Sequence, residues 1–357
     1  MRKFLHKSEI ECPVSALFAW HLRQRAFERL TPPWLDVHVK GMPKLLQAGL
    51  RMDLTIRKYG VPVNCRFEIT ELETDKKFVD VQVQGPFAYW RHEHRFHALA
   101  DERSLMDDEI HFSLPMGFAF DGFVGPFMER DMSRLFRYRH EVLKQDLAAF
   151  MRNRLKPRQK VLLLGEKSPL LEPLMSYLAT QGHSVVAGGL ERQQIEALNV
   201  HEGASVCINI VDRQASGLPA EDLISKHLVN DRSLNLYIEV HDAYAGDNSN
   251  EDFERRCRPL REASVRCLYV RTGAILSPAF GVLKTNRNWR SQTLPWIAVD
   301  DALAAIEQCM FNDTVTGQIH MSANQKKPPT KEFKTLFDIE YPFRYSTLKE
   351  ALNHVLE

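Results

Sequence analysis

The fold of the second half of the chain is decided by the stretch Val161-Leu162-Leu163-Leu164-Gly165. An unbroken apolar run of this length is typical of a parallel strand that is buried on both faces. A helical pattern follows over residues 170–181, and Ser184-Val185-Val186-Ala187 predicts a second strand. A strand, a helix and a strand within about 30 residues form a βαβ unit. Further apolar runs predict strands at residues 205–210, 234–240 and 266–271, so we expect an α/β doubly wound parallel sheet.

A polar, proline-marked break, Lys156-Pro157-Arg158-Gln159-Lys160, precedes this stretch and is the best candidate for a linker. The 357 residues are enough for two domains. We therefore expect one domain over residues 1–155 and a second over residues 160–357.

The composition excludes several classes of protein. A net charge of +1 gives no basic excess, so nucleic-acid binding is not expected as the main function. No apolar run reaches the roughly 18 residues that a membrane helix needs. The first 16 residues contain charged side chains, among them Lys3, Lys7, Glu9 and Glu11, which is unlike a signal peptide. We expect a cytoplasmic protein whose six scattered cysteines are free thiols.

The first half has the pattern of antiparallel strands and one long helix. In residues 51–58, apolar Met52, Leu54 and Ile56 alternate with polar side chains, which is the period of a half-buried strand. Similar segments predict strands at residues 4–10, 64–72, 78–84, 90–96 and 109–114. Helices are predicted over residues 13–30 and 128–153, and a loop rich in Gly and Phe over residues 117–125.

An α+β domain in which a long helix crosses a curved sheet can enclose an apolar cavity. The candidate lining residues are Trp34, Phe67, Phe87, Trp90, Phe112, Phe136 and Tyr138. The alternative is that these aromatic side chains fill the core and leave no cavity.

Three segments carry a resemblance to a known superfamily: Gly85-Pro86-Phe87-Ala88-Tyr89-Trp90-Arg91-His92-Glu93-His94-Arg95-Phe96, Leu114-Pro115-Met116-Gly117 and Leu135-Phe136-Arg137-Tyr138-Arg139-His140. Residues 4–150 resemble the START/SRPBCC superfamily, whose fold is called the helix-grip fold. The resemblance implies binding of an apolar small molecule or lipid, and it does not identify the ligand.

Histidines in this region raise the question of a metal site. His92 and His94 project to one face of a strand, as two metal ligands do. His97 and His111 lie nearby in the sequence, but no carboxylate or cysteine stands at a convincing third position. We therefore expect no metal, and interpret these histidines as polar residues on the outer face of the sheet or at the mouth of the cavity.

The turn after the strand at residues 161–164 reads Gly165-Glu166-Lys167-Ser168-Pro169-Leu170-Leu171. A dinucleotide fingerprint needs three glycines, for the tight turn, for the approach of the pyrophosphate and for helix–strand packing. Only Gly165 remains, since Ser168 and Leu171 occupy the other two positions. Glu166 adds a negative charge that Lys167 partly offsets. Gly165, Lys167 and Ser168 are therefore weak candidates for binding NAD(P).

The second half also resembles a known superfamily, over residues 160–323. The segments that carry the resemblance are Gly182-His183-Ser184-Val185-Val186, Tyr244-Ala245-Gly246-Asp247, Val270-Arg271-Thr272-Gly273-Ala274-Ile275-Leu276-Ser277-Pro278 and Leu294-Pro295-Trp296-Ile297-Ala298-Val299-Asp300-Asp301. They look like the extended short-chain dehydrogenase/epimerase superfamily, and more narrowly like the epimerase-like relatives of a cell-division inhibitor. This implies a Rossmann-like domain and an NAD(P) cofactor.

The same superfamily implies a catalytic Tyr with a Lys four residues later. In this chain Phe253 takes the Tyr position and Cys257 the Lys position, so the catalytic pair is missing. The short stretch over residues 210–234 further predicts that one strand–helix unit is trimmed, which gives a shortened sheet.

Two other groups in the second half are catalytic candidates. His241, Asp242 and Tyr244 follow a predicted strand and form a candidate acid/base group, with an ordinary polar loop as the alternative. Asp300 and Asp301 are a pair of carboxylates, which we interpret as capping the helix that follows them.

Three functional hypotheses follow. The first is a binding protein that holds an apolar molecule in its N-terminal domain and carries a non-catalytic, degenerate NAD(P)-binding-type domain. The second is an NAD(P)-dependent epimerase or oxidoreductase acting on a ligand held by the N-terminal domain. The third is an interaction protein without a ligand in either domain. The sequence does not determine the oligomeric state.

Overall fold

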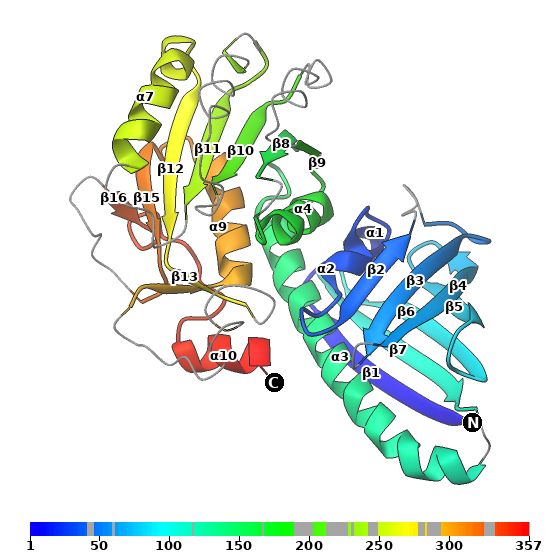
Figure 1. Ribbon diagram of the computed structural model, residues 1–357. Helices are drawn as coiled ribbons and strands as arrows, with labels where there is room; N and C mark the ends of the chain where they lie inside the picture. Colours follow the sequence, from blue (N-terminus) through cyan, green and yellow to red (C-terminus); the bar gives the residue numbers. More distant parts are fainter. Residues whose placement is uncertain are drawn as a thin grey trace. The chain divides into compact units, whose positions relative to one another are not determined.

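The structure is a computed structural model that describes residues 1–40, 46–58, 61–115, 118–165, 168–188, 203–211, 228–229, 232–241, 249–277, 283, 294–324 and 333–356 (Figure 1). The chain divides into two compact units. The first unit contains Met1–Leu155 and Ala179–Gln181, and the second contains Lys156–Leu178 and Gly182–Glu357. A search of the described helices finds none with the length and apolar character needed to cross a membrane.

The first unit is built on a seven-stranded antiparallel sheet in the order β1-β7-β6-β5-β4-β3-β2. The strands are β1 (Arg2–Ile10), β2 (Asp36–Lys40), β3 (Arg51–Lys58), β4 (Val61–Glu73), β5 (Lys77–Gln84), β6 (Tyr89–Ala100) and β7 (Arg103–Ser113). The predicted antiparallel strands are confirmed, and β2 is an addition that the sequence pattern did not indicate. Consecutive strands from β2 to β7 are neighbours in the sheet, so this part is a meander.

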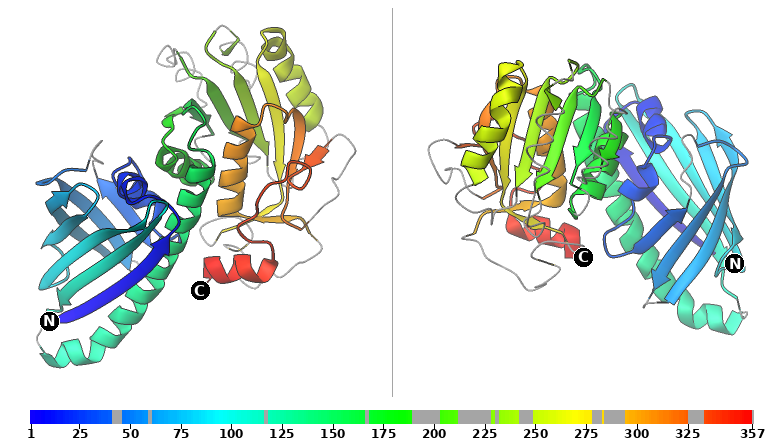
Figure 2. Two further views of the ribbon diagram at one scale, coloured as in Figure 1. Left: turned by 180° about the vertical axis from the view of Figure 1, so that it is seen from behind. Right: turned by 45° about the horizontal axis from the view of Figure 1, so that its top comes forward.

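The long helix α3 (Phe118–Arg152) packs on the inner face of this sheet and lies along β1 in each view (Figure 1, Figure 2). It starts earlier than predicted, because residues 118–125 are helical and not a loop. Gly125 belongs to this first part of the helix, and a Cβ atom there would lie 2.2 Å from the guanidinium carbon of Arg2. Because Gly125 has no side chain, the Arg2 side chain can pass close to the helix backbone. Nη1 of Arg2 then donates a hydrogen bond to Oε1 of Glu129 at 2.8 Å.

The single helix predicted over residues 13–30 is wrong in one respect. Two short helices, α1 (Val14–His21) and α2 (Ala26–Arg29), take its place. Arg25 adopts a left-handed conformation with φ 66°, which interrupts a right-handed helix. The turn lets α2 change direction and contribute Ala26 to the inner wall of the unit.

The second unit contains a parallel sheet in the order β16-β15-β12-β11-β10-β8-β9. Its strands are β8 (Lys160–Leu164), β9 (Ser184–Gly188), β10 (Val206–Val211), β11 (Leu236–His241), β12 (Arg266–Thr272), β15 (Gly317–Met321) and β16 (Phe333–Thr335). A separate pair is formed by β13 (Ala274–Leu276) and β14 (Trp296–Ala298). The parallel sheet expected from residues 161–165 is confirmed.

Helices cover both faces of the parallel sheet. The helices α4 (Leu171–Thr180) and α9 (Val299–Phe311) pack on one face, and α7 (Ser249–Glu262) packs on the other. The helix α10 (Leu348–Leu356) packs against the β13–β14 pair. Most of residues 210–234, where a trimmed unit was predicted, lie outside the described part of the chain. All six cysteines are free and buried, as expected.

Candidate functional site

The first unit contains a cavity of about 270 Å³ between its sheet and its helices, and this cavity is partly open to the surface. Its walls are mainly apolar. The residues that line the cavity and come from the helices and from β3 and β4 include Ala26, Phe27, Leu30, Leu135, Leu143, Met52, Leu54, Ile56 and Ile69. The helix-on-sheet arrangement therefore leaves room inside, and the alternative of a completely filled core does not hold for this unit.

Of the seven aromatic residues predicted to line a cavity, Phe67, Phe87, Trp90 and Phe136 do so. The remaining three do not, which corrects the prediction for Trp34, Phe112 and Tyr138. The Trp34 and Tyr138 rings pack edge to face with their centroids 5.0 Å apart.

Phe112 lies on the inner face of β7, as the alternation of side chains predicted, but its ring packs against other side chains and does not border the cavity. It is completely buried in a cluster that contains Phe4, Ile110 and Met132. Periodicity identifies the inward face of a strand, whereas neighbouring side chains decide which inward residues border empty space.

The cavity also has a polar end, formed by residues of three adjacent strands and of α3. Asp80 on β5 lies opposite His92 on β6, and His94 on β6 lies opposite Asp108 on β7. His140 reaches the same place from α3. Because side chains that face each other across a sheet are close neighbours, this register brings two carboxylates and three imidazoles together. All five residues line the cavity.

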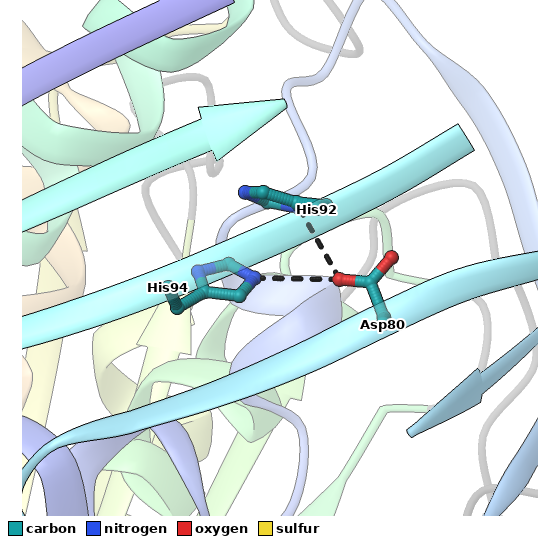
Figure 3. A group of neighbouring side chains, drawn as sticks. All are labelled: Asp80, His92 and His94. Carbon is teal, nitrogen blue, oxygen red and sulfur yellow. Dashed lines mark ion pairs between the residues drawn. The ribbon is translucent and has the colours of Figure 1, made fainter. Parts of the chain in front are cut away.

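The distances in this cluster are short. Nδ1 of His92 and Nε2 of His94 lie 3.2 Å and 3.5 Å from Oδ2 of Asp80 (Figure 3). The opposite ring nitrogens, Nε2 of His92 and Nδ1 of His94, lie 3.0 Å and 2.6 Å from Oδ1 of Asp108. Nε2 of His140 lies 2.5 Å from the other oxygen of Asp108. Each of the two β6 histidines is therefore held between two carboxylates.

The interpretation of His92 and His94 as residues of the outer face is wrong. Their common face is the inner one, since both are buried and face the cavity. His97, on the opposite face of β6, is about half exposed, and its ring lies 3.7 Å from Asp107. His111 pairs with Glu109 on β7, outside the cavity cluster.

A signal for one of the two carboxylates is present in the sequence, although the pattern of histidines alone did not reveal it. Asp108 shares its strand face with the apolar residues Met106 and Ile110. A carboxylate on the apolar face of a strand is uncommon, because a buried charge needs a partner. Asp80 gives no such signal, because it shares its strand face with Gln82 and Gln84 as well as with Phe78.

Burial and charge act against each other in the cluster. Burial disfavours the imidazolium of His92, but the carboxylates of Asp80 and Asp108 outweigh this effect and raise its pKa to about 9. Burial also disfavours the carboxylate of Asp80, and His92 and His94 reverse this and hold its pKa well below the ordinary value. The pKa of Asp108 is lowered in the same way by His94, His140 and His92. Both carboxylates are therefore charged at neutral pH.

Three other polar groups of the cavity wall have unused hydrogen-bonding atoms. Nε2 of His21, Nε1 of Trp90 and Nε of Arg139 are buried without a hydrogen-bond partner. Nδ1 of His21 donates to the carbonyl of Leu17 at 2.8 Å, and burial lowers the pKa of His21 to about 3, so its Nε2 is a hydrogen-bond acceptor. The cavity thus offers one neutral acceptor, one indole donor and one guanidinium.

In the second unit, Gly165 has the conformation that the first glycine of a dinucleotide fingerprint needs for the tight turn between strand and helix. It has φ +119°, and a Cβ atom there would lie 2.5 Å from the carbonyl oxygen of Ile210. The backbone N–H of Ser168 donates to the carbonyl of Gly165 at 2.8 Å, so it is engaged within the turn. Lys167 lies outside the described residues. The described part of the turn fits a tight strand–helix connection, and it supports only part of an NAD(P) site.

The residues at the positions of the catalytic pair are packed into the core. Phe253 is completely buried, with its ring centroid 5.2 Å from that of Tyr269. Cys257 is also completely buried, and its pKa is raised by a hydrogen bond to Cys267 and by burial. A phenyl ring cannot transfer a proton, and a neutral buried thiol cannot replace a lysine.

His241, the one member of the predicted acid/base group within the described residues, belongs to a buried network. Its Nε2 lies 2.6 Å from Glu239, whose carboxylate also accepts hydrogen bonds from Arg256 at 2.5 Å and from Tyr237 at 2.9 Å. Asp242 and Tyr244 lie outside the described residues, so their part of the prediction stays a prediction.

Asp300 and Asp301 lie in the first turn of α9, where acidic residues favour the helix dipole as expected, but no side chain caps this end of the helix by a hydrogen bond. Asp301 instead accepts hydrogen bonds from the hydroxyl of Tyr341 at 3.1 Å and from the backbone of Arg344 at 2.7 Å. Asp300 lies 3.1 Å from Nε2 of His354. Both carboxylates fasten the C-terminal segment to α9, which favours a structural role over a catalytic one.

Comparison with known proteins gives matches in both halves. Residues 10–140 match the family model described as polyketide cyclase / dehydrase and lipid transport. An epimerase family protein of Mycobacterium bovis and one of Mycobacterium tuberculosis are each 25% identical over 132 residues, which is 31% of this chain and 43% of the relative. The aligned part spans less than half the length of these relatives.

A solved structure is similar to the chain throughout its length. It is the crystal structure of a nucleoside-diphosphate sugar epimerase from Corynebacterium glutamicum, with 19% identity and a TM-score of 0.77, and the match covers 100% of this chain and 90% of that chain. At this identity the similarity concerns the fold. Together with the family model and the curated relatives, it supports a START-like part joined to an epimerase-like part.

Proposed function

Starting from a chain that joins a START-like domain to an epimerase-like domain, we propose that the protein binds one apolar small molecule or lipid-like molecule in the cavity of its first unit. The observation that supports the proposal is the mainly apolar cavity of about 270 Å³ with a few polar groups in its wall. Small-molecule sites have this composition, since apolar walls supply affinity and a few polar groups fix the orientation of the ligand.

The polar groups restrict the chemistry of the ligand. A molecule that fills the cavity gains affinity from apolar contacts, and a polar group on it can accept hydrogen bonds from the unused donors of Arg139 and Trp90. The proposed ligand is therefore amphipathic, with an apolar body and one anionic or carbonyl-bearing end.

In this proposal the second unit is a non-catalytic scaffold. The burial of Phe253 and Cys257 supports it, because neither side chain supplies an acid or a base. The replacement of two fingerprint glycines by Ser168 and Leu171 supports it further.

The test is binding of the fluorescent probe 1-anilinonaphthalene-8-sulfonate to the full chain. We expect saturable binding with one site per chain. Ala26→Phe and Leu54→Phe fill the cavity from α2 and from β3, and each is expected to weaken binding at least tenfold. Ala98→Phe makes the same change as Ala26→Phe at an exposed position of β6 and is expected to keep the wild-type affinity.

Circular dichroism and a melting curve verify that each variant is folded, because this probe also binds partly unfolded proteins. Equal affinity of the wild type and both cavity-filling variants, with all three folded, would contradict a site in the cavity.

The second candidate function is an NAD(P)-dependent epimerase or oxidoreductase that acts on the molecule held in the first unit. The conformation of Gly165 favours it, since φ +119° and the close approach to Ile210 are what the first fingerprint glycine provides. Calorimetric titration of the full chain with NADH and NADPH separates the two proposals. Binding of NADH or NADPH with micromolar affinity would favour the NAD(P)-dependent enzyme over the binding protein. No binding at millimolar cofactor concentration would contradict the enzyme.

A further inference from the structure

The polar end of the cavity contains a set of metal ligands that apolar-ligand binding does not explain. Among the described residues, Asp80, His92 and His94 each offer one ligand atom, and these atoms all lie within 4.8 Å of one another. We propose that these three side chains bind one divalent first-row transition-metal ion, zinc or ferrous iron, in the cavity wall. The site goes beyond the proposed function, because it requires no organic ligand.

The distances between the ligand atoms fit such an ion. Bond lengths of about 2.0–2.1 Å in a tetrahedral site place neighbouring ligand atoms about 3.3 Å apart. Oδ2 of Asp80 lies 3.2 Å from Nδ1 of His92 and 3.5 Å from Nε2 of His94 (Figure 3). An ion can therefore occupy the space between the three atoms with only small side-chain movements.

The surroundings of the two histidines are those of metal ligands. A metal-bound imidazole usually donates its second N–H to a carboxylate, which fixes the ring and its tautomer. Here Nε2 of His92 hydrogen-bonds to Oδ1 of Asp108 at 3.0 Å, and Nδ1 of His94 lies 2.6 Å from the same oxygen as an ion-pair contact. His140 holds the other oxygen of Asp108 at 2.5 Å and so fixes the carboxylate itself. Asp108 and His140 are thus positioning residues and not ligands.

The charge of an ion also suits the site. Asp80 is a partly buried carboxylate and Asp108 is a buried one, and the proposed ligands His92 and His94 coordinate a metal as neutral imidazoles. A divalent cation between them balances both negative charges.

The three ligand side chains indicate which metals the site would prefer and how many coordination positions the protein leaves open. Two histidines and one carboxylate are typical of catalytic zinc and of non-haem ferrous iron, which leave coordination positions open. Asp80, His92 and His94 all line the cavity, so the open positions face the space proposed for the organic ligand. A polar group of that ligand, or water, would complete the coordination.

The first experiment titrates the chelator-treated full chain with cobalt(II) and zinc(II). We expect one equivalent of cobalt(II) to produce d–d absorption and one equivalent of zinc(II) to remove it. Asp80→Asn keeps the size of the side chain but removes the anionic ligand, and it is expected to weaken binding at least 100-fold. His97→Gln, on the outer face of the same strand as the proposed ligands, is expected to bind like the wild type.

A second variant separates loss of a ligand from loss of the fold. Asp108→Asn leaves all three ligands in place and disturbs only their orientation, so we expect affinity to fall by about 10- to 100-fold. Far-UV circular dichroism establishes that each variant is folded. Anaerobic competition with ferrous iron identifies the preferred metal, and one-to-one binding of either metal supports the site.

Two results would overturn the proposal. One is a wild-type chain that binds no equivalent of cobalt(II) or zinc(II). The other is folded Asp80→Asn protein that binds the metal as tightly as the wild type does. Because no organic ligand is present, both results leave the test of apolar binding unaffected.

Discussion

Nε2 of His140 donates a hydrogen bond of 2.5 Å to Oδ2 of Asp108, which joins α3 to strand β7 inside the cavity. Both side chains are almost completely buried. The same carboxylate also holds His92 and His94, so a single residue organises the polar end of the cavity.

Removal of the Asp108 carboxylate is expected to destabilise the protein. Asp108→Ala leaves three buried imidazoles without their common partner, and loss of one member of a buried charged group costs about 3–5 kcal/mol. Urea unfolding measures the change in the free energy of unfolding. The matched control is Asp101→Ala in the exposed turn between β6 and β7, for which a change below about 0.5 kcal/mol is expected. A similar small change for both variants would show that the network contributes little.

Arg139 is expected to recognise an anionic group of a cavity ligand. Arg139→Met keeps an apolar side chain and removes the guanidinium, so affinity for 1-anilinonaphthalene-8-sulfonate should fall about tenfold, which corresponds to about 1.4 kcal/mol. Affinity for N-phenyl-1-naphthylamine, which has the same rings without the sulfonate, should change by less than about twofold. Arg137→Met on the exposed face of α3 serves as the control. Equal losses for both probes would indicate a packing effect without charge recognition.

Gly165 is expected to tolerate no side chain. Gly165→Ala places a Cβ atom 2.5 Å from the carbonyl oxygen of Ile210 and strains a backbone at φ +119°, so we expect a loss of about 2–4 kcal/mol in unfolding free energy. Gly317 is the matched control, since it has φ +79° and a Cβ atom added there would meet no described atom within 4 Å. Gly317→Ala should cost about 1 kcal/mol. The difference between the two variants measures the close approach to Ile210 together with the greater backbone strain at φ +119°.

Asp301 is expected to make stability depend on pH. Burial raises its pKa to about 6, against the hydrogen bonds from Arg344 and Tyr345 that lower it. The native state therefore holds this proton more tightly than the unfolded state does. The resulting contribution to stability is complete below about pH 4 and is lost as the pH rises through about 6. A shift of this size corresponds to about 3 kcal/mol.

The measurement compares urea unfolding of the wild type and Asp301→Asn at pH 4, 5, 6 and 7. We expect the variant to gain stability relative to the wild type as the pH rises, because it lacks the buried carboxylate. Asp313→Asn, at a side chain that is 95% exposed, should follow the wild type at every pH. A constant difference between Asp301→Asn and the wild type would contradict the raised pKa.

Much of the architecture could be predicted from local patterns. The apolar run at residues 161–164 indicated a parallel strand, and the two-residue alternation over residues 51–58 indicated an antiparallel one. The errors occurred where tertiary contacts override local preference. Arg25 breaks a helix that the apolar stripe predicted to be continuous, and residues 118–125 are helical despite their glycines.

The candidate site, like the fold, was determined partly by the sequence and partly by the tertiary structure. The sequence by itself determined that His92 and His94 share one face of a strand, because side chains alternate along any strand. Only the tertiary structure decided that this face is the inner one, and that Asp80 and Asp108 lie opposite these histidines. The physical reason is that the pairing register between strands depends on turns and on packing of the whole sheet, and not on the period of one strand. The position of His140 depends on how α3 packs against that sheet, which no local pattern encodes.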